Sequence, residues 1–395
     1  MQFSKKFESI APSPTLAIDS KFKEMKAAGQ NVVGFGAGEP DFDTPDHIKQ
    51  AAINAILSGK TKYTPASGTL ELKKAVCEKF QRDNGLCYEP ANIVVSNGAK
   101  HSLINAFGAI LNPGDEVIVP APFWVSYPEM IKYNDGVPVV LHTTEADGFK
   151  FTPSMLEGVI SSKTKALVLN SPSNPTGMVY TESELRAIAD VCMKHNLYII
   201  ADEIYEHLVY GDAKHVSVAS FSEEIKDKTI IINGLSKTYA MTGWRIGFTA
   251  SNAKIAKLMS NIQSHTTSNP NSIAQEAAVA ALRGPSEELS EMIKQFDARR
   301  KYMVERMNSI EGVSCKEPEG AFYVMMNIEK LIGKTLKGKL IESADDFAEI
   351  FLENQLVAVV PGTGFAAPGH VRWSYATSME NIKEGLDRLE KLLAD

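Results

Sequence analysis

The sequence contains no long hydrophobic run. Its longest apolar stretches, such as residues 356–361, are a handful of residues long, whereas a membrane-spanning helix needs about 20. The first ten residues include Lys5, Lys6 and Glu8, and the apolar middle region of a signal peptide is missing behind them. We therefore expect no membrane partner and a cytoplasmic location.

Cysteine is also scarce, and neither charge sign dominates. The 41 basic and 48 acidic residues give a formal net charge of −7 without blocks of like charge, so we expect no nucleic-acid partner. The absence of a CxxC pair favours buried reduced thiols over disulfides or a metal site. The four cysteines are Cys77, Cys87, Cys192 and Cys315.

Short Val/Ile/Leu runs alternate with helix-period segments from about residue 46. This alternation predicts strands joined by crossover helices, and hence a mostly parallel sheet that is buried on both faces. Thr181 and Glu184 form a capping box for a helix to about His195, and another helix is expected over 98–111. The expected strands are 93–96, 116–120, 137–141, 166–170, 198–202, 229–233 and 245–250.

The pattern changes after Gly284 and Pro285. A long charged helix is expected over 286–310, followed by short strands and a final helix over 378–393. The first 45 residues are too few for a core of their own. We therefore predict a large domain of residues 46–283 and a small domain with an N-terminal arm, formed by residues 1–45 and 284–395.

Three sequence motifs are incomplete. A glycine-rich stretch has Glu39 where the last glycine of a dinucleotide fingerprint belongs, and a near-match to the phosphate-binding loop has Ile328 in place of its first glycine. Glu203, Glu206 and His207 read ExxEH, whereas the inverted zinc motif begins with histidine. We therefore expect no metal, and we interpret these three as solvated polar side chains.

Polar groups follow three successive predicted strands, whose carboxyl ends share one crevice in an open α/β sheet. The turn SPSNPTG follows the first strand, and Asp202 ends the second, where a carboxylate is either a helix cap or a ligand group. Tyr205 lies three residues beyond Asp202, on the same face if a helical turn begins there. Lys237 follows the third strand among uncharged neighbours, and burial there would lower its pKa toward that of a nucleophilic amine.

Eight segments occur in one order along the chain: GEPDFDTP (38–45), KYTPASG (62–68), SNGAK (96–100), PAPFWVSYPE (120–129), SPSNPTG (171–177), DEIYEHL (202–208), SKTYAMTGWRIG (236–247) and VRWSYATS (371–378). Together they resemble the class I aminotransferases, which use pyridoxal 5'-phosphate, and most closely the branch with many bacterial aspartate aminotransferases. The resemblance implies the aspartate aminotransferase-like α/β fold, with a mostly parallel seven-stranded sheet in the large domain and a smaller α/β domain.

The resemblance also implies roles around the cofactor ring. Lys237 would hold the cofactor as a Schiff base and carry the proton at the substrate Cα. Asp202 would keep the pyridine nitrogen protonated. Asn174 and Tyr205 would hydrogen-bond the phenolic oxygen, and Trp124 would stack on the ring.

The implied phosphate site lies at a helix start, where partial positive charge collects. Its backbone amides belong to Gly98, Ala99 and Lys100. Arg245 would add charge-assisted hydrogen bonds. Family members often have serine three positions before the lysine, but this chain has Gly234 there, so Ser236 is the candidate for that hydroxyl contact.

The resemblance implies that Arg372 grips the substrate α-carboxylate in a two-point fork. The Gly38 amide and Asn174 would assist it. Lys100, with Thr15 nearby, would face a side-chain carboxylate, because aspartate-specific relatives of this branch have lysine at that turn.

The implied reaction is ping-pong transfer of an amino group from L-aspartate, or a related amino acid, to 2-oxoglutarate. A prephenate or broader-specificity aminotransferase is the alternative, ranked second because relatives that aminate prephenate tend to have a basic residue where this chain has Ala11. A non-catalytic binding protein and a nucleotide-dependent oxidoreductase are the alternatives from other classes, and the incomplete glycine motifs disfavour the second.

The expected partners are small-molecule amino and keto acids and a second copy of the chain. In the relatives, the tyrosine of the KYTP motif reaches the phosphate of the neighbouring subunit. Tyr63 therefore implies a homodimer with shared active sites. The resemblance further implies cis peptide bonds before Pro122 and Pro175.

Overall fold

The computed structural model describes residues 3–12 and 14–394, and its largest element is a seven-stranded sheet. Its order is β2-β8-β7-β6-β5-β3-β4, and only β8 runs against its neighbours. The strands are β2 (Ile93–Ser96), β3 (Glu116–Ala121), β4 (Val137–His142), β5 (Thr164–Asn170), β6 (Tyr198–Asp202), β7 (Thr229–Gly234) and β8 (Gly247–Ala250). The predicted mostly parallel sheet is confirmed.

The start of the last strand was predicted two residues too early. The sequence places Arg245 inside the last strand, but its φ is 57°, in the left-handed region that a strand cannot accommodate. The strand begins at Gly247 instead. Arg245 therefore lies in the turn between β7 and β8.

Helices cover both faces of the sheet because its strands are apolar on both sides. In β6, Ile200 packs into a core with α5, α6 and α10, whereas Ile199 and Ala201 pack into a core with α8. A third core joins α3, α4 and α11 to β2, β7 and β8. The helices of this part are α3 (Asp46–Leu57), α4 (Leu70–Asn84), α5 (Ala99–Ile110), α6 (Ser126–Tyr133), α7 (Pro153–Glu157), α8 (Glu182–Lys194), α9 (Glu223–Lys228), α10 (Ala253–Ser264) and α11 (Ser272–Arg283).

Two predicted helix starts are confirmed. Gly98 is the N-cap of α5, and Thr181 caps α8 through the predicted capping box with Glu184. The predicted long and final helices correspond to α12 (Glu287–Ser309) and α14 (Met379–Ala394). Both begin and end within two residues of the expected positions.

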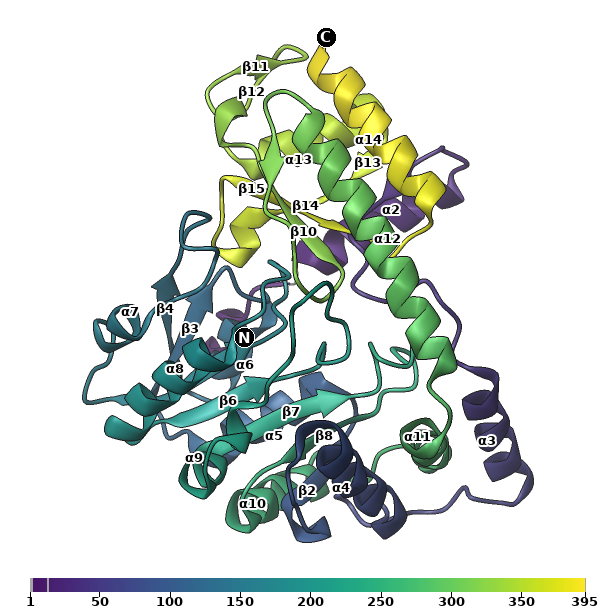
Figure 1. Ribbon diagram of the computed structural model, residues 1–395, viewed down its shortest axis with the longest axis vertical. Helices are drawn as coiled ribbons and strands as arrows, with labels where there is room; N and C mark the ends of the chain where they lie inside the picture. The colour runs from purple at the N-terminus through teal and green to yellow at the C-terminus, as the bar shows by residue number, and fades with distance from the viewer. Residues whose placement is uncertain (1–2, 13, 395) are drawn as a thin grey trace.

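The C-terminal elements lie above the large sheet in Figure 1. Their four-stranded antiparallel sheet has the order β14-β15-β10-β9 and packs with α12, α13 and α14. The remaining elements here are β9 (Ser314–Cys315), β10 (Tyr323–Asn327), β11 (Thr335–Leu336), β12 (Lys339–Leu340), α13 (Ala344–Gln355), β13 (Val357–Ala358), β14 (Val360–Pro361) and β15 (His370–Ser374). Short 3₁₀ helices are η1 (Pro90–Asn92), η2 (Val218–Ser220), η3 (Glu329–Leu331) and η4 (Gly362–Phe365).

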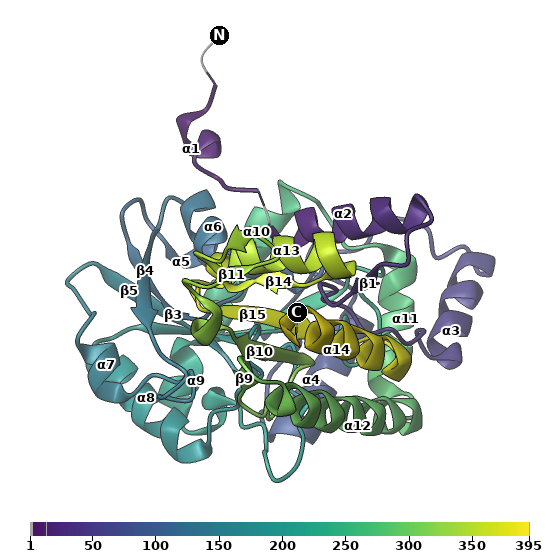
Figure 2. The same ribbon diagram turned by 90° about the horizontal axis from the view of Figure 1, so that it is seen from above.

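The N-terminal segment joins this C-terminal core. Strand β1 (Val33–Gly34) pairs in parallel with β13, and Phe35 packs on Trp373 with ring centroids 4.4 Å apart. Helix α2 (Pro14–Ala27) precedes this strand, and α1 (Lys5–Glu8) extends beyond the body of the molecule in Figure 2. Within the described residues, no helix combines the length and apolarity needed to cross a membrane.

Candidate active site

A cavity of about 450 Å³ lies at the carboxyl ends of β5, β6 and β7, between the large sheet and the C-terminal elements. This is the edge at which open α/β sheets bind ligands. Eleven of the predicted site residues line it: Gly38, Ala99, Lys100, Trp124, Asn174, Asp202, Tyr205, Ser236, Lys237, Arg245 and Arg372. The structure therefore brings together residues from almost the full length of the chain.

Lys237 lies in the turn that follows β7, and its Nζ donates a hydrogen bond to the carbonyl oxygen of Gly38. Burial lowers the pKa of Lys237 to about 8 and outweighs the opposing charge of Glu39, with Arg245 and Arg372 lowering it further. An amine with this pKa is partly unprotonated at neutral pH, and the unprotonated form is the nucleophile and base.

Asp202 ends β6 and is 3% exposed. Its Oδ2 accepts a hydrogen bond of 2.6 Å from the Tyr127 hydroxyl, and Oδ1 accepts one of 3.3 Å from the Ile204 amide. Burial raises the pKa of Asp202 to about 6 despite these two donors. Among the residues that the structure describes, Asp202 has no ion-pair partner, so the carboxylate suits a cationic group of a ligand.

The two predicted partners of the phenolic oxygen are held by other side chains. The Tyr205 hydroxyl lies 3.0 Å from that of Tyr323, a residue of β10. The backbone N–H of Asn174 donates to Asn170 Oδ1 at 2.8 Å, and Asn170 Nδ2 donates to the Asp202 carbonyl at 2.9 Å. The Asn174 backbone is therefore tied to the end of β6, and the Tyr205 hydroxyl to β10.

Helix α5 starts at the cavity with Gly98, whose φ of 85° is readily adopted only without a side chain. The first amides of a helix have no partner within it and attract anions. Arg245 lies against this start, donating from Nη1 to the Thr242 carbonyl at 2.9 Å and from Nη2 to the Asn97 carbonyl at 3.4 Å. The arrangement is a cradle of amides and one guanidinium group that suits a phosphate.

Arg372 comes from β15 on the opposite wall and is 2% exposed. Its Nη1 donates to Asn174 Oδ1 and its Nη2 to the Gly36 carbonyl, each at 3.0 Å. Its Nε is buried and has no hydrogen-bond partner among the described side chains and backbone. A buried guanidinium with an unpaired donor is suited to a carboxylate ligand.

Lys100 and Trp124 form a third wall of the cavity. Lys100 Nζ lies 4.9 Å from the centre of the Trp124 ring, and burial, followed by the charge of Arg245, lowers its pKa. The Trp124 ring in turn meets Tyr127 edge-on at 5.3 Å. A planar ring and a cation are thus presented side by side.

These groups fit pyridoxal 5'-phosphate on their own chemistry. The α5 amides with Arg245 match the phosphate, the buried Asp202 matches a protonated ring nitrogen, and the Lys237 amine matches the aldehyde. Gly234 offers no hydroxyl, whereas Ser236 lines the cavity. The residue set can therefore hold the cofactor.

Tyr63 lies away from the cavity, and the predicted Thr15 contact lies outside what the structure describes. Tyr63 is 92% exposed and does not line the cavity of its own chain. Thr15 belongs to α2, but its side chain lies outside what the structure describes. The predicted cis bonds Ala121–Pro122 and Asn174–Pro175 are both present, with a third, Ser171–Pro172, that the sequence did not indicate.

The lining residues that were not predicted include four with polar side chains that bear on the site: Glu39, Tyr127, Asn170 and Tyr323. Tyr127 and Tyr323 look like core tyrosines in the sequence. Their polar partners are 75 and 118 positions away, so no local pattern reveals them. Asn170, in contrast, could have been predicted, because it ends a predicted strand directly before the SPSNPTG turn.

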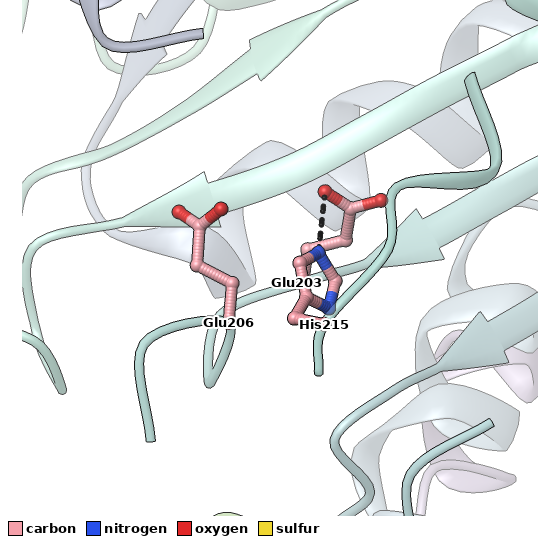
Figure 3. Close-up of side chains that lie close together, drawn as sticks. All are labelled: Glu203, Glu206 and His215. Carbon is pink, nitrogen blue, oxygen red and sulfur yellow. Dashed lines mark ion pairs between the residues drawn. The ribbon is translucent and has the colours of Figure 1, made fainter. Parts of the chain in front are cut away.

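The interpretation of Glu203 and Glu206 as solvated side chains is wrong. They are 3% and 5% exposed, because side chains from distant parts of the sequence compensate them: Lys79 Nζ lies 2.5 Å from Glu206 Oε1, and His215 Nε2 lies 3.4 Å from Glu203 Oε2. Figure 3 shows the Glu203 carboxylate at the His215 ring and that of Glu206 to one side. One ligand atom from each of these three residues lies within 4.8 Å of the others.

Comparison with known proteins identifies the same family. The chain matches the family described as aminotransferase class I and II over residues 30–389. It is 48% identical to an aspartate aminotransferase of Bacillus subtilis over 393 residues, which cover 100% of this chain and 99% of that protein. It is also 48% identical to an aspartate/prephenate aminotransferase of Cereibacter sphaeroides, with coverage of 98% and 97%.

Solved structures agree with the fold. The aspartate aminotransferase from Rhizobium meliloti superimposes with a TM-score of 0.96 at 44% identity, covering 100% of this chain and 99% of that one. The Thermus thermophilus aspartate aminotransferase with maleate gives a TM-score of 0.93 at 41% identity, with coverage of 99% and 100%.

Proposed function

The chain belongs to the class I and II aminotransferases, a family that depends on pyridoxal 5'-phosphate, and on that premise we propose that it moves the amino group of L-aspartate to 2-oxoglutarate. The observation that carries the proposal is a single cavity lined by the Lys237 amine together with the buried Asp202 carboxylate and the buried Arg372 guanidinium. The relatives named aspartate aminotransferase support the choice of donor.

Bound pyridoxal 5'-phosphate supplies an aldehyde that condenses with amines and a ring that accepts electrons from the substrate Cα. Lys237, with its pKa near 8, takes and returns the proton at that carbon. Asp202, oriented by Tyr127, keeps the ring nitrogen protonated. Tyr205 and Asn174 hydrogen-bond the phenolic oxygen of the ring.

Arg372 orients the substrate in this mechanism. Its free Nε and the adjacent terminal nitrogen offer a fork for the α-carboxylate. Asn174 already holds Nη1 from one side, and Gly36 holds Nη2 from the other. The guanidinium is therefore preorganised, so less rotamer entropy is lost when the substrate binds.

A visible absorbance spectrum tests the cofactor assignment. The chain with added pyridoxal 5'-phosphate should develop a coloured adduct that borohydride reduction fixes on the Lys237 peptide. Absence of such an adduct at saturating cofactor would contradict the proposed function.

We further propose that Lys100 selects dicarboxylic substrates. Lys100→Ala should lower kcat/KM for aspartate by about 100-fold, because removing one member of a desolvated charge pair costs a few kcal/mol. An apolar donor should lose far less, and steady-state kinetics with both donors measure the difference. Equal losses for the two donors contradict this role.

Prephenate is the second candidate acceptor, favoured by relatives named aspartate/prephenate aminotransferase. We rank it below 2-oxoglutarate. A panel of keto acids with aspartate as donor decides the order, and a higher kcat/KM for prephenate than for 2-oxoglutarate reverses it.

We also propose that the enzyme is a homodimer. Tyr63, with its exposed ring, would then complete the phosphate site of the second copy. Exposed apolar side chains nearby in the sequence support an interface there: Ile56 is 54% exposed, Leu57 80% and Leu70 59%. Burial of such side chains is the main driving force of association.

A further inference from the structure

Buried charges gather behind the cavity, next to the turn that follows β6. Within this turn, Asp202 and Tyr205 line the cavity, whereas Glu203 and Glu206 do not. The two glutamates instead contact α4, β7 and the loop that carries His215. The turn therefore has one side with the proposed cofactor contacts and another with two buried carboxylates that the proposed mechanism does not use.

The Glu206 carboxylate joins three separate parts of the chain. Oε1 lies 2.5 Å from Lys79 Nζ of α4 and accepts a hydrogen bond of 2.7 Å from Asn233 Nδ2 of β7. Oε2 accepts a hydrogen bond of 3.1 Å from Asn84, the last residue of α4. Lys79 Nζ also donates to Asn84 Oδ1 at 2.7 Å, which closes the network.

Lys79 is the counterion of this network. The side chains of Lys79 and Glu206 are each 3% exposed. Burial alone would raise the pKa of Glu206, but Lys79, followed by His207 and His215, lowers it to about 2. Glu206 is therefore ionised at neutral pH, with the ammonium group of the chain itself as its cation. The neighbouring Glu203 has its own partners, His215 at 3.4 Å and the Ser217 hydroxyl at 2.7 Å.

Asn233 connects the network to the other wall of the cavity. It is the penultimate residue of β7, and its Oδ1 accepts a hydrogen bond of 2.7 Å from the amide of Gly234. Ser236 and Lys237 follow within four positions. The bond from Asn233 to Glu206 thus joins the segment before Lys237 to the turn that carries Asp202 and Tyr205.

We propose that Glu206 is a positioning residue that fixes Asp202 and Tyr205 relative to Lys237 through its hydrogen bond with Asn233. This proposal rests on the proposed function, because it assigns a purpose to the distance between the groups that hold the cofactor. The charge of Lys79 keeps Glu206 ionised, and the hydrogen bond supplies the alignment.

Two double variants separate alignment from charge balance. Lys79→Met/Glu206→Gln and Lys79→Met/Glu206→Met both remove the ion pair, and replacement of both charges by apolar or neutral groups is often tolerated. Only the glutamine variant keeps an acceptor for Asn233. The readouts are the dissociation constant of the cofactor-free protein for pyridoxal 5'-phosphate and the pH midpoint of the bound cofactor's visible absorbance.

The methionine double variant should bind the cofactor about ten-fold more weakly than the glutamine double variant, as expected for a lost buried hydrogen bond. The pH midpoint of the cofactor absorbance should shift from the wild-type value in the methionine variant and stay unchanged in the glutamine variant. Equal dissociation constants and midpoints in the two variants overturn the proposal. If the methionine variant does not fold, Asn233→Ala, which keeps the ion pair, replaces it. Asn233→Ala should then show the same weaker binding and shifted midpoint, and values equal to those of the glutamine variant overturn the proposal.

Two controls complete the experiment. Arg300→Met removes a buried arginine that pairs with Asp297 at 2.7 Å, outside the cavity. It should lower thermal stability without changing cofactor affinity, and a matching loss of affinity would identify the Glu206 effect as general destabilisation and refute positioning. A wild-type chain that binds no pyridoxal 5'-phosphate refutes the proposed function itself, which is a different outcome from equal double variants.

Discussion

Burial shifts the pKa values of Asp202 and Lys237 in opposite directions, each toward the uncharged form. Without a ligand, the folded protein is therefore less stable than it would be with an apolar pocket of the same shape. A cofactor with a cationic ring nitrogen and an aldehyde removes both penalties. Cofactor binding and folding stability are linked at these two residues.

Asp202→Asn should stabilise the cofactor-free protein at pH 7.5. The folded pKa of Asp202, about 6, is above its usual 3.8, so stability is lost as the pH rises through this interval, and asparagine avoids the loss. The expected gain in unfolding free energy is on the order of 3 kcal/mol. Urea denaturation should show the advantage shrinking between pH 7.5 and pH 5. A constant advantage at both pH values would falsify the assignment of the effect to this carboxylate.

Tyr127→Phe tests the hydroxyl that holds Asp202. A donor to the carboxylate lowers the pKa of Asp202, so its removal should raise that pKa and weaken the hold on a protonated ring nitrogen. We expect kcat to fall about ten-fold, as for the loss of a hydrogen bond to a charged group. The cofactor absorbance should change with pH at a higher midpoint than in the wild type. An unchanged kcat and midpoint rule out this role.

At the scale of elements, the packing of α5 on β8 determines where the helix starts. A Cβ atom on Gly247, the first residue of β8, would overlap the backbone of Gly98 and Ala99. The phosphate cradle therefore depends on a glycine in another strand as well as on its own residues.

Gly247→Ala should displace the start of α5 and weaken the affinity for pyridoxal 5'-phosphate by about ten-fold or more. Gly243→Ala is the matched control, because a Cβ there would meet no atom within 4 Å. Equilibrium binding to the cofactor-free proteins measures both. Equal affinities for the two variants contradict the dependence on this close approach.

The seven strands could be predicted because burial on both faces leaves an apolar run in each. The direction of β8 could not be predicted from the apolar run at 245–250, because such a run is compatible with either direction. The turn at Arg245 was missed because this run begins with a residue that lies outside the strand. The connection from β7 to β8 carries no helix, and this is the signal that could have indicated an antiparallel strand.

The site residues that belong to the family motifs could be predicted from the sequence. Asp202 and Lys237 lie at strand ends, so their grouping followed from the sheet. Tyr127, Tyr323 and the ion pair of Lys79 with Glu206 depend on contacts between distant segments, and a buried tyrosine or lysine has no sequence pattern of its own. The domain boundary near Arg283 and the assignment of roles to the site residues stay predictions.

At the scale of the whole molecule, shared active sites predict complementation. Lys237→Ala should abolish turnover by removing the amine, and Tyr63→Ala should impair the phosphate site of the other subunit. Mixed heterodimers of the two inactive variants should regain part of the activity, because one of their two sites has both residues. Steady-state assays after subunit exchange measure this. An active monomer by light scattering, or no recovery in verified heterodimers, contradicts the shared site.

The pairing of β1 with β13 also has a consequence for biosynthesis. Val33 meets Val357 in this pairing, so a segment near residue 33 waits for one that is synthesised much later. The large sheet, complete at Ala250, can form on the nascent chain, whereas Gly36 and Arg372 can meet only after Arg372 has been synthesised. The growing chain can therefore form the proposed cofactor cradle before the proposed substrate contact of Arg372.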